Sequence, residues 1–197
     1  MTPSLSDLSH ALLDAARMAG AESADALAVA GTAVSIEIRK GALETAERSE
    51  GVEIGLRVLI GRRQACVSAS DTSAATITAL AERAVAMARE APEDATAGLA
   101  EASQLASAWD VGALDLADPA GEPGAAVLEA SARAVEAAAL EASGITQVEA
   151  SAAYSQRALH LAATNGFSGG YGRTSTSLSA VAFTGQGTDM QRDYAGE

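Results

Sequence analysis

The chain has few of the side chains that form disulfides or bind metals. Its single cysteine, Cys66, excludes an intrachain disulfide and fits a reducing compartment. Its two histidines, His10 and His160, belong to no motif with metal-ligand spacing, and no His-Glu-x-x-His motif occurs. We expect His10 to face solvent on a helix and His160 to be a structural residue of a strand. The sequence therefore predicts no metal site and no cofactor in this chain.

The sequence also contains no recognised catalytic nucleophile. Cys66 stands between Ala65 and Val67, where a cysteine is expected to be a small buried hydrophobe rather than a reactive thiolate. The serines of the run 174–179 do not lie in a Gly-x-Ser-x-Gly motif. Residues 169–172, Gly-Gly-Tyr-Gly, lack the lysine and the following helix of a phosphate loop. We assign no catalytic residue.

Basic residues are scarce, because 13 lysines and arginines stand against 26 acidic residues and the net charge is −13. Such a chain repels phosphate backbones, so we expect no nucleic-acid partner. No apolar run approaches the length of a membrane span, and residues 1–10 lack the features of a signal peptide. We therefore expect no membrane contact and a soluble, cytoplasmic protein.

Aromatic residues make up only 3% of a chain that is 48% hydrophobic, so alanine, valine, leucine and isoleucine must build the core. Apolar residues at helical spacing, with capping residues at the ends, predict three helices: Ser4 to Gly20, Asp71 or Ser73 to the residue before Pro92, and 125–143. Residues 92–124, which we call the connector, hold three of the four prolines. We expect the connector to cross the surface of the protein with Trp109 as its anchor.

Residues 158–183 have the pattern of a strand, a tight turn, a glycine-rich passage and a second strand. Apolar and other residues alternate over 158–163, and Asn165-Gly166 is a pair that tolerates positive φ in a turn. The glycines that follow have two interpretations: close approach of a peptide or an anion, or a bend or bulge in the sheet. Tyr171 and Arg173, beside these glycines, are weak candidates for substrate contact. We also expect Gly55, inside another strand, to mark a close approach of another backbone or a bulge.

The two ends of the chain have the same order of helix, strand, hairpin turn and strand. Gly20 and Gly144 end the two helices and lie 124 residues apart, as do Gly61 and Gly185. We infer an internal duplication. The expected fold class is α+β, a mixed or antiparallel sheet covered by helices. The expected division is a first α/β half at 1–91, the connector at 92–124, and a second half at 125–197.

Several segments together resemble the TldD/PmbA family. The first half carries Arg39-Lys40-Gly41-x-Leu43-Glu44, then GVEIGLRVLIGRRQACVSAS at 51–70, then the helix ERAVAMAREAPED at 82–94. The second half, ATNGFSGGYGRTSTSLSAVAFTGQGTDMQRDY at 163–194, resembles the PmbA branch, also called TldE. The resemblance covers nearly the whole chain.

The resemblance implies a TldD–TldE metalloprotease that acts on small or unfolded peptides. In that family, a zinc-binding helix motif with paired histidines belongs to the TldD subunit. Nothing in this chain matches the motif, so no catalytic residue is carried over, and zinc is expected only in a TldD-type partner. The PmbA branch is implied to be the non-catalytic partner, with a C-terminal domain that would follow Tyr194.

The leading hypothesis is therefore a scaffold and assembly domain of a PmbA/TldE-type subunit. Its expected partners are a TldD-type subunit, or a second copy through self-association, and a peptide substrate. A self-sufficient peptidase is one alternative, and it would need metal ligands that the sequence does not offer. A non-proteolytic interaction module, in keeping with the family's older name of modulator of DNA gyrase, is the other.

Overall fold

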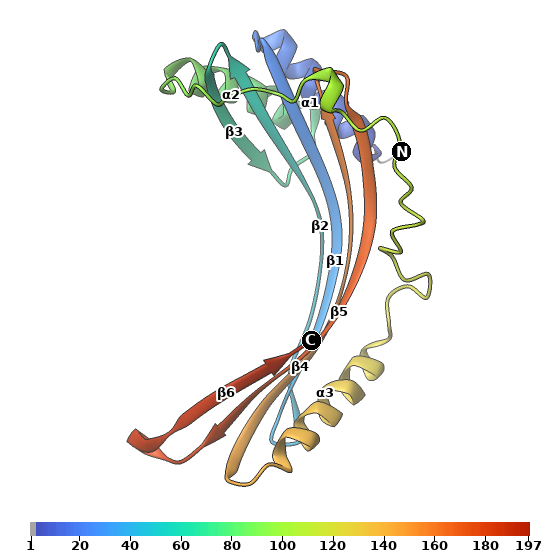
Figure 1. Cartoon of the computed structure of the whole chain (residues 1–197), viewed down its shortest axis with the longest axis vertical. Coiled ribbons are helices and arrows are strands. Elements are labelled where there is room, and N and C mark those ends of the chain that lie inside the picture. The colour runs from blue at the N-terminus through green and yellow to red at the C-terminus, as the bar shows by residue number, and fades with distance from the viewer. Residues whose placement is uncertain (1–2) are drawn as a thin grey trace. The chain divides into compact units, whose positions relative to one another are not determined.

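The computed structural model describes residues 3–197 (Figure 1). The helices within that range are α1 (Leu5–Ala19), α2 (Ala74–Glu90) and α3 (Ala125–Leu140), with 3-10 turns η1 (Ala102–Gln104) and η2 (Gly187–Asp189). The strands are β1 (Ser23–Arg39), β2 (Ala42–Ile60), β3 (Arg63–Ala69), β4 (Ile145–Ala163), β5 (Ser168–Thr184) and β6 (Gln191–Gly196). In this part of the chain, no helix combines the length and the apolar character that crossing a membrane requires.

The strands form one sheet in the order β3-β2-β1-β4-β5-β6, and the outer pairs β2–β3 and β5–β6 are antiparallel. The expected α+β class is confirmed.

The order of elements also follows the inferred duplication. A helix, a long hairpin and a short outer strand occur first as α1, β1, β2 and β3, and again as α3, β4, β5 and β6.

The four central strands are longer than the sequence patterns predict. Residues 25–30 and 34–39 belong to the single strand β1, and the polar segment 43–49 belongs to the same strand as residues 52–60. The register with β3 covers Ile54–Ile60 of β2, so the polar segment lies beyond that pairing. Strands of 17 or 19 residues are far longer than the usual length of about five or six.

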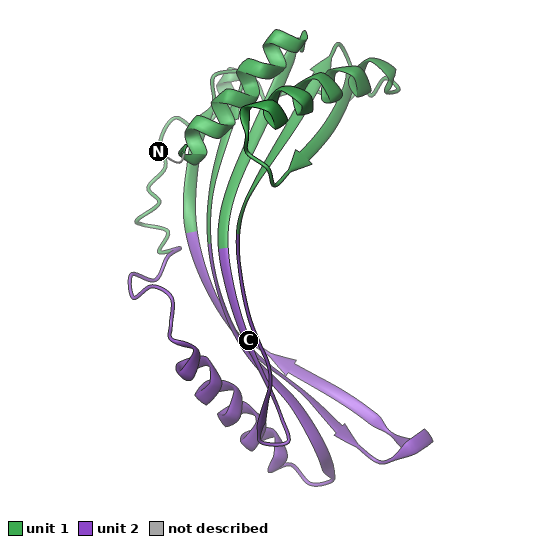
Figure 2. Cartoon of the chain, turned by 180° about the vertical axis from the view of Figure 1, so that it is seen from behind, with its two compact units in different colours: residues 1–31, 51–115, 157–172 green, residues 32–50, 116–156, 173–197 purple. Residues whose placement is uncertain are grey.

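The chain folds into two compact units (Figure 2). Unit 1 comprises residues 1–31, 51–115 and 157–172, and unit 2 comprises 32–50, 116–156 and 173–197. Each unit therefore contains segments from both the first and the last third of the chain. This grouping differs from the division at 1–91, 92–124 and 125–197, because the strands β1, β2, β4 and β5 each contribute residues to both units.

Unit 1 is built on α1 and α2. Helix α1 begins as predicted, with a capping box between Ser4 and Asp7, and ends at Gly20 in the left-handed conformation. Ser73 caps α2 by accepting a hydrogen bond from the backbone N–H of Thr76. Leucines and alanines of both helices pack on the alanine-rich start of β1 and on the apolar face of β2, in a core that includes Leu12, Ala16, Leu80, Ala84, Ala26, Ile54 and Val58. Small side chains therefore build this core, as the composition predicts.

Cys66 lies on the opposite face of the edge strand β3, and its expected burial is wrong. Along β3, Ala65 is buried whereas Cys66 and Ser68 are exposed. The reason is the two-residue period of a strand, since Ala65 takes the inward position next to Cys66. Cys66 is the cross-strand neighbour of Arg57.

Unit 2 contains a second, smaller core between α3 and the sheet. Its members are Val34, Ile36, Ile38, Leu128, Ala132, Ala152 and Tyr154. Helix α3 also carries a buried carboxylate beside this core. Glu136 of α3 is only 4% exposed, and both of its carboxylate oxygens accept the backbone N–H of Gly41 at 3.0 Å. Arg133 of the same helix donates to the carbonyl oxygen of Gly41.

These contacts fix the hairpin turn between β1 and β2. Lys40 and Gly41 have φ values of 53° and 69°, as expected for a tight turn with two left-handed residues. A lysine is strained in that region, because its Cβ approaches the backbone. The hydrogen bonds from α3 to Gly41 therefore hold a turn that its own sequence favours only in part.

We predict that Glu136→Ala destabilises the protein by about 1–3 kcal/mol, because the Gly41 N–H loses a charged acceptor in a partly buried position. Glu141→Ala is the matched control, since Glu141 is exposed just after the same helix. Urea unfolding followed by circular dichroism measures both. Equal effects of the two substitutions would show that the Gly41 contact contributes nothing specific.

Candidate functional site beneath the connector

Within unit 1, the connector covers the face of the sheet that the helices leave free. Ala162 points into the helical core and is fully buried, so the alternating neighbours Leu161 and Ala163 lie on the other face. The connector is fixed there by hydrogen bonds. The Asp94 N–H donates to the Arg62 carbonyl at 2.8 Å, and the Asn165 side-chain amide donates to the Ala100 carbonyl at 2.9 Å.

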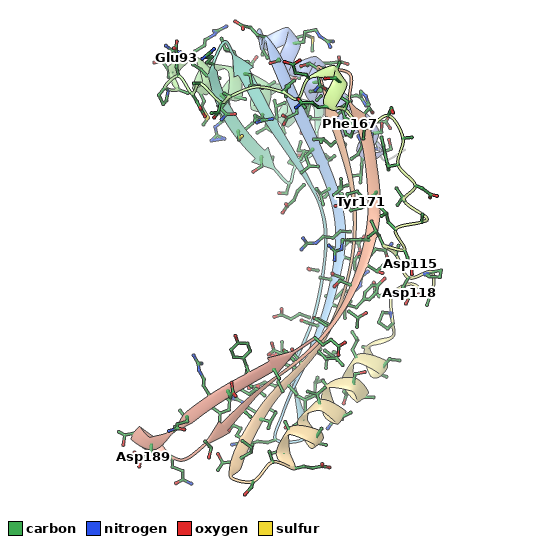
Figure 3. The ribbon with its side chains drawn as sticks, viewed as in Figure 1. Glu93, Asp115, Asp118, Phe167, Tyr171 and Asp189 are labelled. Carbon is green, nitrogen blue, oxygen red and sulfur yellow. The ribbon has the colours of Figure 1, made fainter. Side chains whose placement is uncertain are left out.

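Trp109 anchors the connector, as predicted. Its indole stacks on the Phe167 ring with centroids 5.8 Å apart and an interplanar angle of 28°. The indole also lies directly over Gly169, where any Cβ would overlap it. Figure 3 places Phe167 and Tyr171 along the start of β5, on the stretch that the connector follows.

A pocket of about 380 Å³ lies between the connector and the sheet. Its walls are mostly apolar and come from three segments of unit 1: Asp25, Arg57, Leu99, Ala100, Gln104, Leu105, Ala106, Leu161, Ala163, Asn165 and Phe167. A second pocket of about 240 Å³ is lined by Ala106, Trp109, Leu159, Leu161, Phe167, Gly169, Gly170 and Tyr171. The two pockets share Ala106, Leu161 and Phe167, so they adjoin. Apolar walls with few polar groups are typical of ligand sites.

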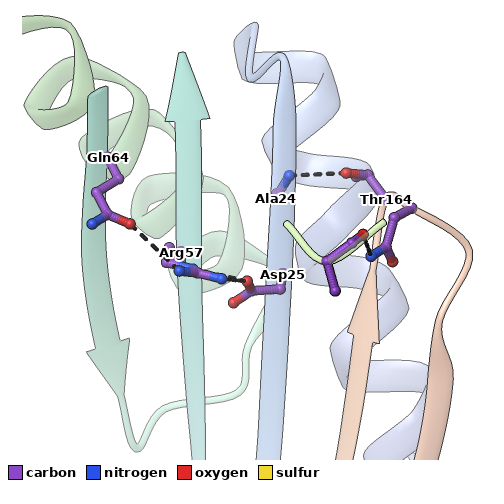
Figure 4. Close-up of polar contacts among 7 residues, drawn as sticks. Ala24, Asp25, Arg57, Gln64 and Thr164 are labelled. Carbon is purple, nitrogen blue, oxygen red and sulfur yellow. Dashed lines mark hydrogen bonds and ion pairs between the residues drawn. The ribbon is translucent and has the colours of Figure 1, made fainter. Parts of the chain in front are cut away.

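An ion pair forms the polar part of the larger pocket (Figure 4). The Arg57 Nε donates to Asp25 Oδ2 at 2.8 Å, Nη2 donates to the same oxygen, and Nη1 donates to Gln64 Oε1 at 3.4 Å. The hydrogen bond to Asp25 raises the pKa of Arg57, against the opposing effect of burial. Both Arg57 contacts to Asp25 use Oδ2, and within residues 3–197 Asp25 Oδ1 accepts no hydrogen bond.

The glycine-rich stretch serves packing within the fold. Gly169 makes room for Trp109, and a Cβ on Gly170 would overlap the carbonyl oxygen of Leu159 on the neighbouring strand β4. Gly55 does not mark a close approach, because a Cβ there would lie at an ordinary 3.9 Å from the nearest backbone oxygens. The expected close approach at Gly55 is therefore wrong, and the constraint lies at Gly169 and Gly170 instead.

The two candidate residues for substrate contact fall in different places. Tyr171 lines the smaller pocket and is 41% exposed. Arg173 is exposed but is not part of either pocket wall, and it belongs to unit 2. The structure thus brings Tyr171, but not Arg173, to the pockets beneath the connector.

His160 belongs to a polar cluster that sequence reasoning missed. Its Nδ1 lies 2.7 Å from Oγ of the fully buried Ser9, and its Nε2 lies 3.3 Å from Ser168 Oγ. The Ser9 hydroxyl donates to the Ser6 carbonyl at 3.0 Å, so Ser9 is left to accept from a protonated Nδ1. The remaining lone pair on Nε2 then accepts from Ser168. His160 therefore ties α1 to the start of β5.

Sequence reasoning from the serines at 174–179 missed a Gly-x-Ser-x-Gly spacing at Ser168. Residues 166–170, Gly-Phe-Ser-Gly-Gly, have the Gly-x-Ser-x-Gly spacing of a nucleophile elbow. That motif requires a strand, a sharp turn and a helix, whereas Ser168 opens the strand β5. The hydrogen-bond geometry therefore supports a structural role for His160, as the sequence predicts.

His10 and His160 lie close to each other in unit 1. The ring of His10, which is exposed as predicted, lies 5.7 Å from the ring of His160 between centroids. Among the described residues, no group of three or more histidine, cysteine, aspartate or glutamate side chains is placed to hold a metal ion. Because a structural zinc usually takes four protein ligands and a catalytic zinc three, this donor set does not fit the ion.

Two models of one protein family match the chain. PmbA/TldA metallopeptidase domain 1 matches residues 24–88, and the PmbA/TldA metallopeptidase central domain matches residues 118–197. The metalloprotease PmbA of Escherichia coli O157:H7 is 31% identical over 165 residues, which cover 83% of this chain and 36% of that protein. The chain belongs to the PmbA/TldA metallopeptidase family. The resemblance found in the sequence is confirmed.

Solved structures with the PmbA/TldA fold agree. A protein of Bacteroides thetaiotaomicron named as a modulator of DNA gyrase has a TM-score of 0.84 and 21% identity, over 96% of this chain and 43% of its own. TldE from Thermococcus kodakarensis has a TM-score of 0.75 and 11% identity, over 95% of this chain and 42% of its own. The chain thus spans less than half the length of these relatives. The first family model ends before the connector, and the second begins within it at residue 118.

We predict that Gly170→Ala destabilises this PmbA/TldA domain by about 1–3 kcal/mol, because the added methyl must displace the β4 backbone at Leu159. Gly172→Ala is the matched control two residues along β5, since a Cβ there would lie 3.7 Å from the Arg157 carbonyl oxygen. Thermal unfolding by circular dichroism compares the two variants. A Gly172→Ala variant that loses as much stability would contradict the close approach at Gly170.

The histidine cluster predicts a pH dependence of stability. Burial, and then the nearby charge of His10, lowers the pKa of His160 from its ordinary value of 6.5. The unfolded chain therefore binds more protons than the folded chain as the pH falls below about 6.5. The contribution of His160 should be fully present above that pH and should be lost progressively below it, toward the folded pKa.

Urea unfolding at pH 7.5 and pH 5.5 measures this effect. We expect a smaller loss of stability between the two pH values in His160→Gln than in the unchanged protein. His10→Gln is the control and should retain most of the loss, because burial is the larger cause. A pH dependence that is unaltered in His160→Gln would refute the assignment.

Proposed function

We propose that this chain forms a scaffold and assembly domain of a PmbA/TldE-type subunit, the non-catalytic partner of a TldD-type zinc protease. The substrates would be small or unfolded peptides. Membership of a metallopeptidase family carries the proposal, together with a donor set that does not fit zinc. The fold shared with TldE from Thermococcus kodakarensis supports the assignment to the TldE branch.

The chemistry of amide hydrolysis supports the same division of roles. Cleavage of an unactivated amide needs an activated water or a strong nucleophile. Cys66 is exposed on an edge strand, and Ser168 lies at the start of β5 rather than in a nucleophile elbow. Zinc would therefore be held by residues outside this chain, in the remaining part of the protein or in a partner subunit.

The proposal predicts that the 197-residue chain alone does not cleave casein-like or unstructured peptides, with or without added zinc. The full-length protein mixed with its TldD-type partner should cleave them, and a chelator should abolish the cleavage. Peptide products are quantified by mass spectrometry, and the assembly is measured by size-exclusion chromatography with light scattering. Chelator-sensitive cleavage by the isolated chain would restore the self-sufficient peptidase.

A second candidate is a non-proteolytic interaction module. Two similar solved proteins, from Bacteroides thetaiotaomicron and Thermotoga maritima, are each named as a modulator of DNA gyrase, and these names favour it. The net charge of −13 makes a protein surface a better target than DNA. An assembled pair that cleaves no unfolded peptide, together with gyrase captured from the native cell, would favour this candidate.

A further inference from the structure

The adjoining pockets beneath the connector have no role in the packing of either core. Leu161, Ala163 and Phe167 form the sheet side, and Leu105 and Ala106 form the connector side. The combined space exceeds 380 Å³, within the range of sites that take small ligands. An apolar side chain of leucine or phenylalanine size would occupy part of it and remove apolar surface from water, which is favourable.

Two polar atoms at the edge of the larger pocket are free to bind a ligand. Asp25 Oδ1 accepts no hydrogen bond within residues 3–197, because Arg57 uses Oδ2. Gln104 accepts the Glu101 N–H with Oε1 at 2.8 Å, which leaves its Nε2 as a donor with no partner in the same range. One free acceptor and one free donor match the N–H and C=O of a peptide group.

The charge of the pocket also selects among apolar ligands. The wall of the larger pocket carries one acidic and one basic side chain, Asp25 and Arg57, which form an ion pair with each other. A ligand carboxylate, such as that of a fatty acid, would lose its water there without meeting an unpaired cation in that wall. A neutral peptide group has no such penalty. Backbone groups can then fix the orientation while the apolar walls select the side chain, a division of roles seen in other peptide sites.

We propose that the pockets beneath the connector bind a peptide segment, with a large apolar side chain between Leu161 and Ala106 and a backbone amide at Asp25 and Gln104. This inference deepens the proposed function and rests on it, because it names the part of a peptide that the scaffold domain holds. The site lies entirely within unit 1.

The protein contains an intrinsic fluorescent probe for ligand binding. Trp109 is the single tryptophan and lines the smaller pocket, stacked on Phe167. Titration with the capped peptide acetyl-Gly-Leu-Gly-amide should change the Trp109 emission in a saturable way. Acetyl-Gly-Ser-Gly-amide should bind at least about tenfold more weakly, since a leucine side chain gains more than about 1.4 kcal/mol from burial.

Two variants test the site directly. Ala106→Phe should abolish the response by filling the space that the pockets share, whereas Ala108→Phe, two residues along the connector and outside both walls, should leave it unchanged. Gln104→Glu keeps the Oε1 acceptor for Glu101 but removes the free donor, and it should weaken peptide binding about tenfold. This second variant keeps the test valid if Ala106→Phe fails to fold.

Three results would overturn the inference. They are an unchanged Trp109 emission with both peptides, equal losses in Ala106→Phe and Ala108→Phe, and tight binding of decanoate without binding of the peptides. The last result would assign the pockets to a lipid-like ligand. Failure here is separate from failure of the proposed function, because assembly with a TldD-type partner is measured on the full-length protein without these peptides.

Discussion

The length of the central strands is the constraint on which the rest of the structure depends. A strand of 19 residues rises about 60 Å, whereas a helix of 17 residues is only about 25 Å long. One helical layer therefore cannot cover the whole length of β2 or β4. The protein meets this requirement with separate coverings, α1 and α2 over the core of unit 1 and α3 over the core of unit 2.

The strand length also explains why the compact units are discontinuous in sequence. Two of the long strands, β1 and β4, carry residues of one core in one part of their sequence and residues of the other core in the other part. Along β1, Ala26 packs with α1 and α2, whereas Ile36 packs with α3. The two inferred copies of a helix and a long hairpin thus each contribute residues to both cores.

The pockets beneath the connector exist because the connector has little regular secondary structure. Residues 92–124 form only the short turn η1, so specific contacts, not a regular element, hold the segment on the sheet. In unit 1 these contacts are chemically distinct: the Asp94 N–H with the Arg62 carbonyl, the Asn165 side-chain amide with the Ala100 carbonyl, and the indole of Trp109 over Gly169. Because the contacts are separated along the chain, the space between them is left open as pockets.

Local sequence determined the three helices, two of the hairpin turns and several element ends. The capping box of Ser4 and Asp7, the left-handed stop at Gly20, the turns at Lys40-Gly41 and Asn165-Gly166, and the alternation along β2 all follow from short-range sterics and hydrogen bonding. The family resemblance was also readable, because motifs such as GVEIGLRVLIG are contiguous. Trp109 was recognised as an anchor because a lone large aromatic in a polar segment needs a surface to pack on.

Tertiary structure alone decided which of these residues meet. The residues around Cys66 do not show which face of β3 is exposed to solvent. The residues around Gly41 do not indicate that its N–H will donate to Glu136 of α3, 95 residues away. The same holds for His160 with Ser9, 151 residues apart, and for Asp25 with Arg57. The physical reason is that strand pairing and helix packing bring together residues distant in sequence, whereas periodicity and capping report only on neighbours.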